Sequence, residues 1–504
     1  MDSLRLGHQP LTLQDVVEVA YQNRRVELSQ GARTRIKSAH QFLQNELKKG
    51  GTYYGINTGF GSLAQVKIPA EQLGALQLNL LRSHACGVGP ELEEAPVRAM
   101  LLLRAANLAQ GHSGVSVPLV EQILALLNAG VHPCIPEQGS VGASGDLAPL
   151  AHLALVLIGE GQARVKHQVV SGAEALKRAG LKPLVLGPKE GIALINGTQF
   201  MTALGVLNWH EAQRLAQVSH LAGAMSLEAL RGTTQAFEPE IHAVRAHPGQ
   251  IQVAETLRSW LLCDEGPSEI SQSHSGCGKV QDPYSLRCMP QVHGASLDAL
   301  SYVQQVLERE INSVTDNPLI FPEQGKILSG GNFHGQTLAI AMDLLAISVS
   351  ELGSISEQRL AKLVNSTFSD LPAFLTLEGG TNSGFMIVHV ASAALASENK
   401  TLCHPASVDS IPTSADKEDH VSMGAWAARK ASRVIANVRK ILTFELLGAA
   451  QGIDLLRPLK TSSRLECVHR RIRQKVPQLT QDRPFYPDYG PIEELIQSGE
   501  LLQF

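Results

Sequence analysis

The chain of 504 residues is long enough for roughly two to four domains, and a hydrophobic share of 44% argues against wholesale disorder. A formal net charge of −4 at pH 7 favours neither a nucleic acid nor a membrane surface as a partner. Seven cysteines without a Cys-x-x-Cys pair indicate reduced thiols rather than a disulfide framework.

The N-terminal segment MDSLRLGHQP lacks the apolar core of a secretory signal. No uninterrupted apolar run reaches the roughly 18 residues that a membrane-spanning helix needs. We therefore expect a soluble, cytoplasmic protein. Glycine clusters at 50–61, 87–89 and 139–145 break the N-terminal part of the chain into shorter elements.

Long helices are predicted for much of the remaining chain. Apolar side chains recur at intervals of three and four over 295–314 and 427–446, which is the spacing of one helix face. Several stretches also lack proline, the residue that breaks helix interiors. These runs of about 20 to 45 residues exceed the usual helix length and favour a helix bundle. The proline-free stretches are 189–238, 323–371, 373–404 and 413–457.

These patterns predict a mainly α protein without a large sheet. We expect an N-terminal domain over residues 1–200, which contains the glycine-rich loops, and a long-helix bundle over 201–504 that ends in a helical cap. The basic residues within 470–475 are interpreted as a solvated helix face.

Several familiar site motifs are missing from the sequence. The segment GCGK at 276–279 is followed by Val280 and lacks the spacing of a P-loop, and no Gly-x-Gly-x-x-Gly follows an apolar strand. The order around Ser144 misses the Gly-x-Ser-x-Gly nucleophile elbow by one residue. Pairs of His and Cys are too sparse for a structural zinc site. We expect neither a metal nor a nucleotide cofactor.

Ala143, Ser144 and Gly145 form a tripeptide of small residues within GSVGASGDLAPL at 139–150. Because glycine leaves its backbone nitrogen unobstructed, the Gly145 nitrogen can attack the Ala143 carbonyl carbon and close a five-membered ring. Loss of one water makes an imidazolone, and loss of the Ser144 hydroxyl as a second water leaves an electrophilic methylidene group. The neighbouring Asp146 carboxylate could move protons during closure. Taken alone, the tripeptide is more often a flexible loop.

The context of this tripeptide resembles the signature of the aromatic amino acid ammonia-lyases, in which Ala-Ser-Gly becomes the prosthetic group 4-methylidene-imidazol-5-one (MIO). Further segments resemble this family in unbroken order from about residue 50 to residue 424, and the family-like DRPFYPD follows at 482–488. The segments are YGINTGFGSL at 54–63, INGTQF at 195–200, QDPYSLRCMPQVHG at 281–294, NSVTDNPLI at 312–320, GGNFHGQ at 330–336 and SVDSIPTSADKEDHVSMG at 407–424.

The resemblance implies a role for each matched residue. Tyr54 would remove the β-proton of the substrate, which requires surroundings that stabilise its phenolate. Arg287 would bind the substrate carboxylate through two parallel hydrogen bonds, and Asn196 would orient that carboxylate or MIO. Further residues would shape the site. These are Gln281, Tyr284, Asn317 and Phe333.

The residues that would contact the substrate ring are polar. Ser83 and His84 resemble the pair in family members that act on histidine, whereas members that act on phenylalanine tend to have Phe-Leu and those that act on tyrosine His-Leu. Glu418 would accept a hydrogen bond from an imidazole N–H, and a buried carboxylate that faced a phenyl ring would be unpaired. The resemblance therefore implies conversion of L-histidine to trans-urocanate and ammonia.

The sequence departs from the family pattern at two places. Tyr53 precedes Tyr54, so only alignment to the Tyr-Gly step selects the second phenol. Asp416 and Lys417 replace residues that are more often uncharged, and the added cation beside Glu418 favours its ionised form.

Each site residue also has a structural interpretation that the matching motif contexts disfavour. These interpretations are Tyr54 as a core aromatic, His84 as a structural histidine, Asn196 as a turn residue, Arg287 as a salt-bridge partner and Glu418 as a solvated turn. Three other functions stay open: another MIO enzyme (a phenylalanine or tyrosine lyase or an aminomutase), a catalytically silent helical scaffold, and a fumarase-like lyase without MIO. Addition of the substrate amine to MIO and addition of its ring are both compatible with the sequence.

The resemblance also implies an architecture. Members of this family resemble the fumarase/aspartase-like fold, with a long central helix bundle and a smaller N-terminal MIO-bearing domain. They are homotetramers whose active sites draw residues from more than one subunit.

Overall fold

The computed structural model is mainly α, which confirms the fold class predicted from the sequence. It describes residues 2–59, 61, 65–263, 266–278 and 280–504. The chain forms two compact units. The first unit contains Met1–Leu207, Gln304–Asp343 and Pro405–Arg429, and the second contains Asn208–Val303, Leu344–His404 and Lys430–Phe504. The division at residue 200 stays a prediction, and both units are discontinuous in sequence.

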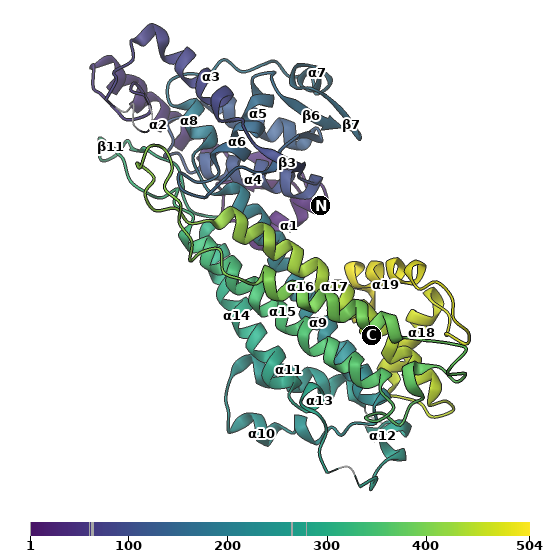
Figure 1. The fold of residues 1–504 in the computed structure, drawn as a ribbon. Coiled ribbons are helices and arrows are strands. Elements are labelled where there is room, and N and C mark those ends of the chain that lie inside the picture. Colours follow the sequence, from purple (N-terminus) through teal and green to yellow (C-terminus); the bar gives the residue numbers. More distant parts are fainter. Residues whose placement is uncertain (1, 60, 62–64, 264–265, 279) are drawn as a thin grey trace. The chain divides into compact units, whose positions relative to one another are not determined.

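The first unit combines short helices with small sheets (Figure 1). Its central helix α4 (Glu94–Ala109) is buried at every residue from Val97 to Ala109. The other helices are α1 (Leu13–Tyr21), α2 (Gln30–Lys48), α3 (Leu73–His84), α5 (Val117–Asn128), α6 (Leu147–Leu157), α7 (Gly172–Arg178) and α8 (Glu190–Ile195).

The sheets of the first unit are small. β1 (Leu4–Leu6) pairs with β2 (Val26–Leu28) in parallel. The antiparallel pairings are β3 (Val88–Glu91) with β5 (Pro136–Gln138), β10 (Leu319–Phe321) with β11 (Lys326–Leu328), and β6 (Gln162–Val165) with both β4 (Val131–Pro133) and β7 (Gln168–Ser171).

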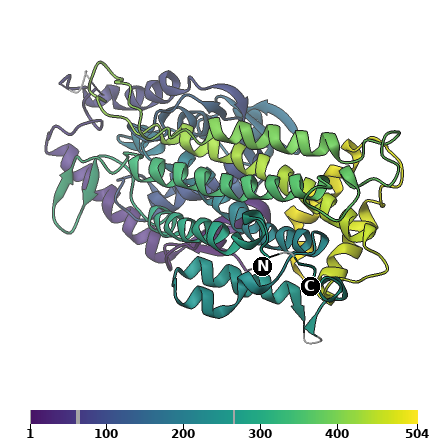
Figure 2. The ribbon, with the colours of Figure 1, turned by 60° about the horizontal axis from the view of Figure 1, so that its bottom comes forward.

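Four long helices lie within the proline-free stretches, and a fifth follows the apolar spacing predicted over 295–314. They are α9 (Gln199–Ala229), α14 (Met289–Glu310), α15 (Gln336–Val364), α16 (Met386–Leu402) and α17 (Gly424–Leu455). Their portions in the second unit lie side by side in both ribbon views (Figures 1 and 2). α14 ends before the predicted window 295–314 does, because the side chains of Asn312 and Ser313 donate to the carbonyls of Glu308 and Arg309.

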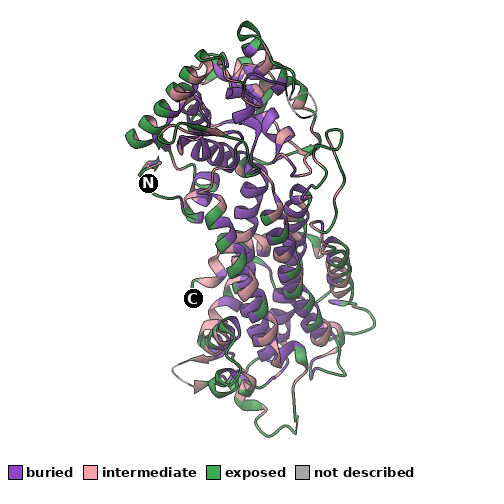
Figure 3. Ribbon diagram, turned by 90° about the vertical axis from the view of Figure 1, so that its left-hand side faces the viewer, coloured by how far each residue is buried: buried purple, intermediate pink, exposed green. Residues whose placement is uncertain are grey.

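Helix α17 shows how the sequence pattern becomes a core. Ala431, Val434, Val438 and Leu442 recur every three or four residues, and all four are fully buried. Figure 3 shows that buried residues follow the long helices in this way. Each Å² of apolar surface buried along such faces contributes about 25 cal/mol, and this burial stabilises the bundle.

Helix α15 is an exception to the expectation on membrane spans. Its apolar window has a mean hydropathy of 1.7, so by length and composition alone the helix could cross a membrane. However, 67% of that window is buried inside the structure, as in the core helix of a soluble protein. The length and composition of α15 are therefore only weak evidence for a membrane-spanning helix.

Shorter elements complete the second unit. β8 (Leu262–Cys263) pairs with β9 (Gly266–Pro267) in antiparallel. The helices are α10 (Pro239–Ala243), α11 (Pro248–Leu261), α12 (Glu269–Ser273), α13 (Tyr284–Arg287), α18 (Ser463–Lys475) and α19 (Tyr486–Ser498).

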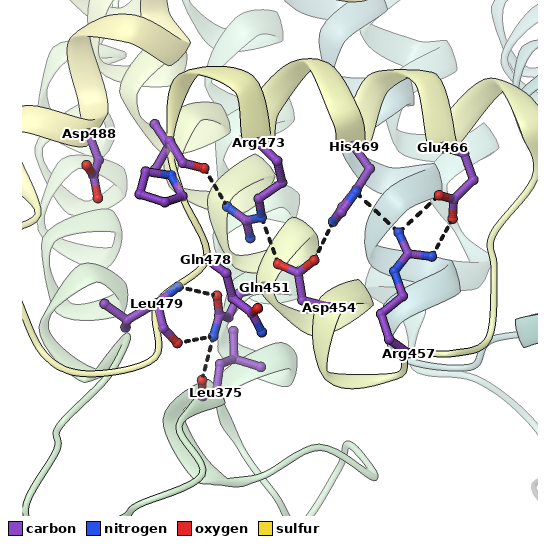
Figure 4. Close-up of polar contacts among 12 residues, drawn as sticks. Leu375, Gln451, Asp454, Arg457, Glu466, His469, Arg473, Gln478, Leu479 and Asp488 are labelled. Atoms are coloured by element: carbon purple, nitrogen blue, oxygen red, sulfur yellow. Dashed lines mark hydrogen bonds and ion pairs between the residues drawn. The ribbon is translucent and has the colours of Figure 1, made fainter.

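An ionic network attaches α18 to the end of α17 (Figure 4). Asp454 bonds to the His469 ring nitrogen Nε2 and to the Nε of Arg473, both at 2.7 Å. The Arg457 guanidinium donates to both carboxylate oxygens of Glu466. The Arg473 side chain is only 15% exposed, so the interpretation of this basic stretch as a solvated face is wrong for Arg473, which faces Asp454.

We expect Asp454→Asn to lower the free energy of unfolding by about 1–3 kcal/mol at neutral pH, because asparagine has no charge to pair with the Arg473 guanidinium and one acceptor oxygen instead of two. Burial alone raises the pKa of the Asp454 carboxyl, but hydrogen bonding to His469 and the charge of Arg473 lower it overall. Stability from a lowered pKa is present above the unfolded pKa and is lost as the pH falls through the folded pKa. Urea unfolding at neutral pH and near pH 3 checks this, and an equal difference at both pH values would contradict it.

Candidate active site

The first unit contains a cavity of about 1230 Å³. Most residues predicted for the site from the sequence line it, although they come from seven separate segments of the chain. These lining residues are Tyr54, Ser83, His84, Ala143, Ser144, Asn196, Asn317, Phe333 and Glu418. Phe60, Ser62 and Leu63 of the motif at 54–63 lie outside the described residues.

The loop around Ser144 is tightly packed. Gly145 has a φ of +74°, and a β-carbon there would lie 2.1 Å from the carbonyl oxygen of Gly197. Gly142 has a φ of +68°, and a β-carbon there would lie 2.3 Å from the hydroxyl oxygen of Ser422. Since only glycine combines these backbone angles with such close approach, the glycines serve packing. A flexible surface loop does not describe this segment.

Asn196 holds the backbone of Ser144. Its Nδ2 donates to the Ser144 carbonyl oxygen at 2.8 Å. The Asn196 side chain is buried, and its Oδ1 has no hydrogen-bond partner among the described residues. Buried polar atoms are normally paired, so this oxygen is available to a group that enters the cavity.

Asp146 is a buried carboxyl directly after the tripeptide. It accepts hydrogen bonds from the backbone N–H groups of Phe200 and Met201, both at 3.0 Å, and from the Ser140 hydroxyl at 3.1 Å. Burial raises the pKa of Asp146 to about 7 in spite of these donors. A carboxyl that titrates near neutral pH can both accept and donate a proton there.

Glu418 faces the tripeptide from the loop that follows α16. The Ser144 hydroxyl donates to its Oε1 at 2.5 Å, and the Thr413 hydroxyl donates to its Oε2 at 2.5 Å. Lys417 lines the same cavity. The motif predicted Glu418, whereas no sequence pattern indicated a role for Thr413.

The two adjacent phenols point to different places. Tyr54 lines the cavity, and its oxygen accepts a hydrogen bond from the Gly61 N–H at 3.3 Å. Tyr53 packs against a separate apolar cluster and donates to Glu46 at 3.1 Å. Burial and this carboxylate raise the pKa of Tyr53. The geometry therefore agrees with the selection of Tyr54 from the Tyr-Gly step.

His84 ends α3 at the cavity wall. Its Nδ1 lies 2.8 Å from the Leu80 carbonyl oxygen and 3.1 Å from the Ser83 hydroxyl. Burial lowers the pKa of His84, although the Leu80 carbonyl and the charge of Glu418 oppose this. A neutral imidazole that donates from Nδ1 to a carbonyl has its lone pair on Nε2, so His84 can accept a hydrogen bond there.

A layer of buried polar and charged residues lies behind the cavity and was not predicted from the sequence. Arg104 on α4 is fully buried and donates from Nη1 to the Asn196 carbonyl oxygen and to Gln199, both at 2.9 Å. Lys189 and Asp316 form a buried ion pair at 2.7 Å, directly before Asn317. The arginines in the mostly apolar α4, Arg98 and Arg104, were the available signal, because arginine is rarely buried without partners.

Gln281, Tyr284 and Arg287 belong to the second unit, and the cavity of the first unit does not include them. Tyr284 is 70% exposed. The guanidinium carbon of Arg287 lies 4.6 Å from the centroid of the Tyr284 ring. Tyr284 and Arg287, which the same motif contains, are thus in contact on α13.

Metal ligands do not cluster in the part of the chain that the structure describes. No three His, Cys, Asp or Glu side chains there are grouped so that they could hold a metal ion.

Comparison with known proteins places these observations in a family. The sequence model of the aromatic amino acid lyases matches residues 11–474. A histidine ammonia-lyase of Anaeromyxobacter dehalogenans is 53% identical over 99% of this chain and 100% of its own. One from Sorangium cellulosum is 54% identical over 98% of this chain and 97% of its own.

Solved structures agree with the sequence comparison. Histidine ammonia-lyase from Trypanosoma cruzi has a TM-score of 0.92 and 46% identity, covering 100% of this chain and 94% of its own. Tyrosine aminomutase from Streptomyces globisporus has a TM-score of 0.94 and 36% identity, covering 100% of this chain and 98% of its own. The relationship inferred from the motifs is confirmed: the chain belongs to the aromatic amino acid lyase family.

Proposed function

We propose that the protein is a histidine ammonia-lyase, which removes ammonia from L-histidine without oxidation and releases trans-urocanate, the first step of histidine degradation. The observation that carries this proposal is the convergence of Tyr54, His84, Ser144 and Glu418 on one cavity. Relatives of that name that match nearly the full length of the chain support it.

The tripeptide Ala143-Ser144-Gly145 is the proposed source of MIO. The Gly145 nitrogen bonds to the Ala143 carbonyl carbon, and the carbonyl oxygen leaves as the first water. The Ser144 Cα proton and hydroxyl then leave as the second water, which creates the double bond. The positive φ of Gly145 and the hydrogen bond from Asn196 to the Ser144 carbonyl fit this group. Asp146, with a pKa of about 7, is placed to move protons.

When formed, MIO supplies an electrophile that draws electrons from the substrate. The residues around it bind and orient that substrate. His84 and Glu418 bind the imidazole, as Ser83 beside them holds the His84 ring. The Asn196 amide oxygen, which has no partner among the described residues, can accept a hydrogen bond from the substrate's amino group. Tyr54 removes the β-proton.

We further propose a cytoplasmic homotetramer with shared active sites. Arg287 would bind the substrate carboxylate in a neighbouring subunit's cavity, together with Tyr284 and Gln281. The high exposure of Tyr284 supports this arrangement. Large apolar side chains exposed on the long helices of the second unit support self-association, because such surface is costly to leave in water. They include Tyr302, Ile347, Ile387 and Val390.

The substrate is tested by incubating the purified protein with L-histidine, L-phenylalanine and L-tyrosine in turn. We expect the ultraviolet absorbance of a conjugated acid to grow with L-histidine alone, since only imidazole offers ring N–H and lone-pair partners for His84 and Glu418. Growth with an aromatic substrate instead would overturn the assignment of the cavity. If chromatography detects a β-amino acid as the product, the protein is an aminomutase.

A further inference from the structure

The two carboxylate oxygens of Glu418 have different partners. Oε1 accepts from the Ser144 hydroxyl and Oε2 accepts from the Thr413 hydroxyl, each at 2.5 Å. Hydrogen bonds from a hydroxyl to a carboxylate are short and about twice as strong as those between neutral groups. Together the two donors fix the plane of the Glu418 carboxylate.

The turn between Thr413 and Glu418 is built to bring the two side chains together. Their backbones form a bridge, with the Thr413 N–H donating to the Glu418 carbonyl at 3.0 Å and the Glu418 N–H donating back at 3.3 Å. Three successive residues between them, Ser414, Ala415 and Asp416, have φ values of +53°, +51° and +61°. Residues other than glycine rarely adopt such angles, because the β-carbon then crowds the following carbonyl oxygen at a cost in free energy. The closing hydrogen bonds offset that cost.

Formation of MIO removes one of the two partners but not the other. The Ser144 Cβ–Oγ bond breaks and the Cα proton is lost, so the hydroxyl that donates to Oε1 leaves the chain as water. The Thr413 hydroxyl takes no part in this step and continues to hold Oε2. An oxygen of a held carboxylate is then exposed in the cavity without a donor, and it favours a new N–H donor.

We propose that Thr413 is a positioning residue that aims Oε1 of Glu418 at the imidazole N–H of the substrate, and that the Ser144 hydroxyl occupies this position until the ring forms. This rests on the proposed function, because it requires both the dehydration of Ser144 and an imidazole substrate. Thr413 therefore contributes to specificity through Glu418 and does not itself touch the substrate.

Thr413→Val tests this, because valine keeps the branched shape and removes only the hydroxyl. We expect the variant to lose two waters from its intact mass as the unaltered protein does. Its KM for L-histidine should rise about tenfold, the effect of one hydrogen bond to a charged group, with a smaller change in kcat. Thr413→Ser, which restores the hydroxyl, should restore the KM. Thr34→Val, at an exposed residue of α2, is the matched control.

Two competitive inhibitors distinguish a loss of the Glu418 orientation from a general disturbance of the cavity. Urocanate and cinnamate share a carboxylate and a side chain of the same length, but only urocanate has a ring N–H. Thr413→Val should raise the inhibition constant of urocanate about tenfold and change that of cinnamate by less than about twofold. The role of Thr413 would be overturned if the variant bound both inhibitors equally more weakly or bound urocanate as tightly as before. It would also be overturned if the intact mass of the variant lacked the loss of two waters. If the unaltered protein fails to deaminate histidine, the proposed function itself fails, which is a separate result.

Discussion

Ser144→Ala is expected to abolish deamination, with a loss of about 10³-fold or more in kcat, the scale on which removal of a covalent catalytic group acts. Alanine has no hydroxyl to leave as the second water, so the electrophilic double bond cannot form. The intact mass of the purified variant should lack the loss of two waters that the unaltered chain shows. Mass spectrometry and the absorbance assay with L-histidine measure the two effects independently.

The packing around Ser144 is expected to stay unchanged in Ser144→Ala, so a loss of activity would report on the missing hydroxyl. Alanine is smaller than serine, and it leaves Gly142 and Gly145 with their backbone angles, so the loop should keep its fold. Among the described residues, the hydrogen-bond partner of the Ser144 hydroxyl is Glu418. Ser259→Ala, at an exposed residue of α11 in the second unit, is the control and should keep both the mass loss and the activity. Substantial turnover by Ser144→Ala would mean that the tripeptide is not the source of the electrophile.

Nine of the residues selected from the sequence line one cavity, and the proposed chemistry restricts the residue type at several of these positions. Ser144 must have a hydroxyl to lose, and Gly145 must approach Gly197 closely. The proline-free stretches likewise predicted α15 and α17, because proline disrupts helix interiors wherever they pack. Local chemistry of this kind is visible in the residues themselves.

The supporting residues were not predictable in the same way. Arg104 holds the backbone of Asn196 across ninety-two positions of sequence, and Thr413 acts through the carboxylate of Glu418. Their roles depend on which segments meet in space, and several residue types satisfy the same hydrogen bond elsewhere in proteins. The compact units were hidden for a similar reason, since 304–343 and 405–429 join the N-terminal segment through tertiary packing alone.

Tyr54→Phe is expected to leave the mass loss intact while lowering kcat by about 10²–10⁴-fold, the usual contribution of a general base. The substitution removes one oxygen from the cavity wall, where it accepts the Gly61 N–H. It leaves untouched Ser144, Asp146 and Asn196, the residues assigned to ring formation. KM should change little, because proton removal stabilises the transition state more than the bound substrate.

Tyr53→Phe is the matched control, one residue away in the same turn. Its hydroxyl donates to Glu46 outside the cavity, so its loss should lower the free energy of unfolding by about 1 kcal/mol or less and leave kcat unchanged. A fall in kcat for Tyr53→Phe with normal turnover by Tyr54→Phe would exchange the roles of the two phenols. If neither substitution lowers kcat, the β-proton must leave through another group on the cavity wall, and His84, neutral with a lone pair on Nε2, is the nearest chemical equivalent.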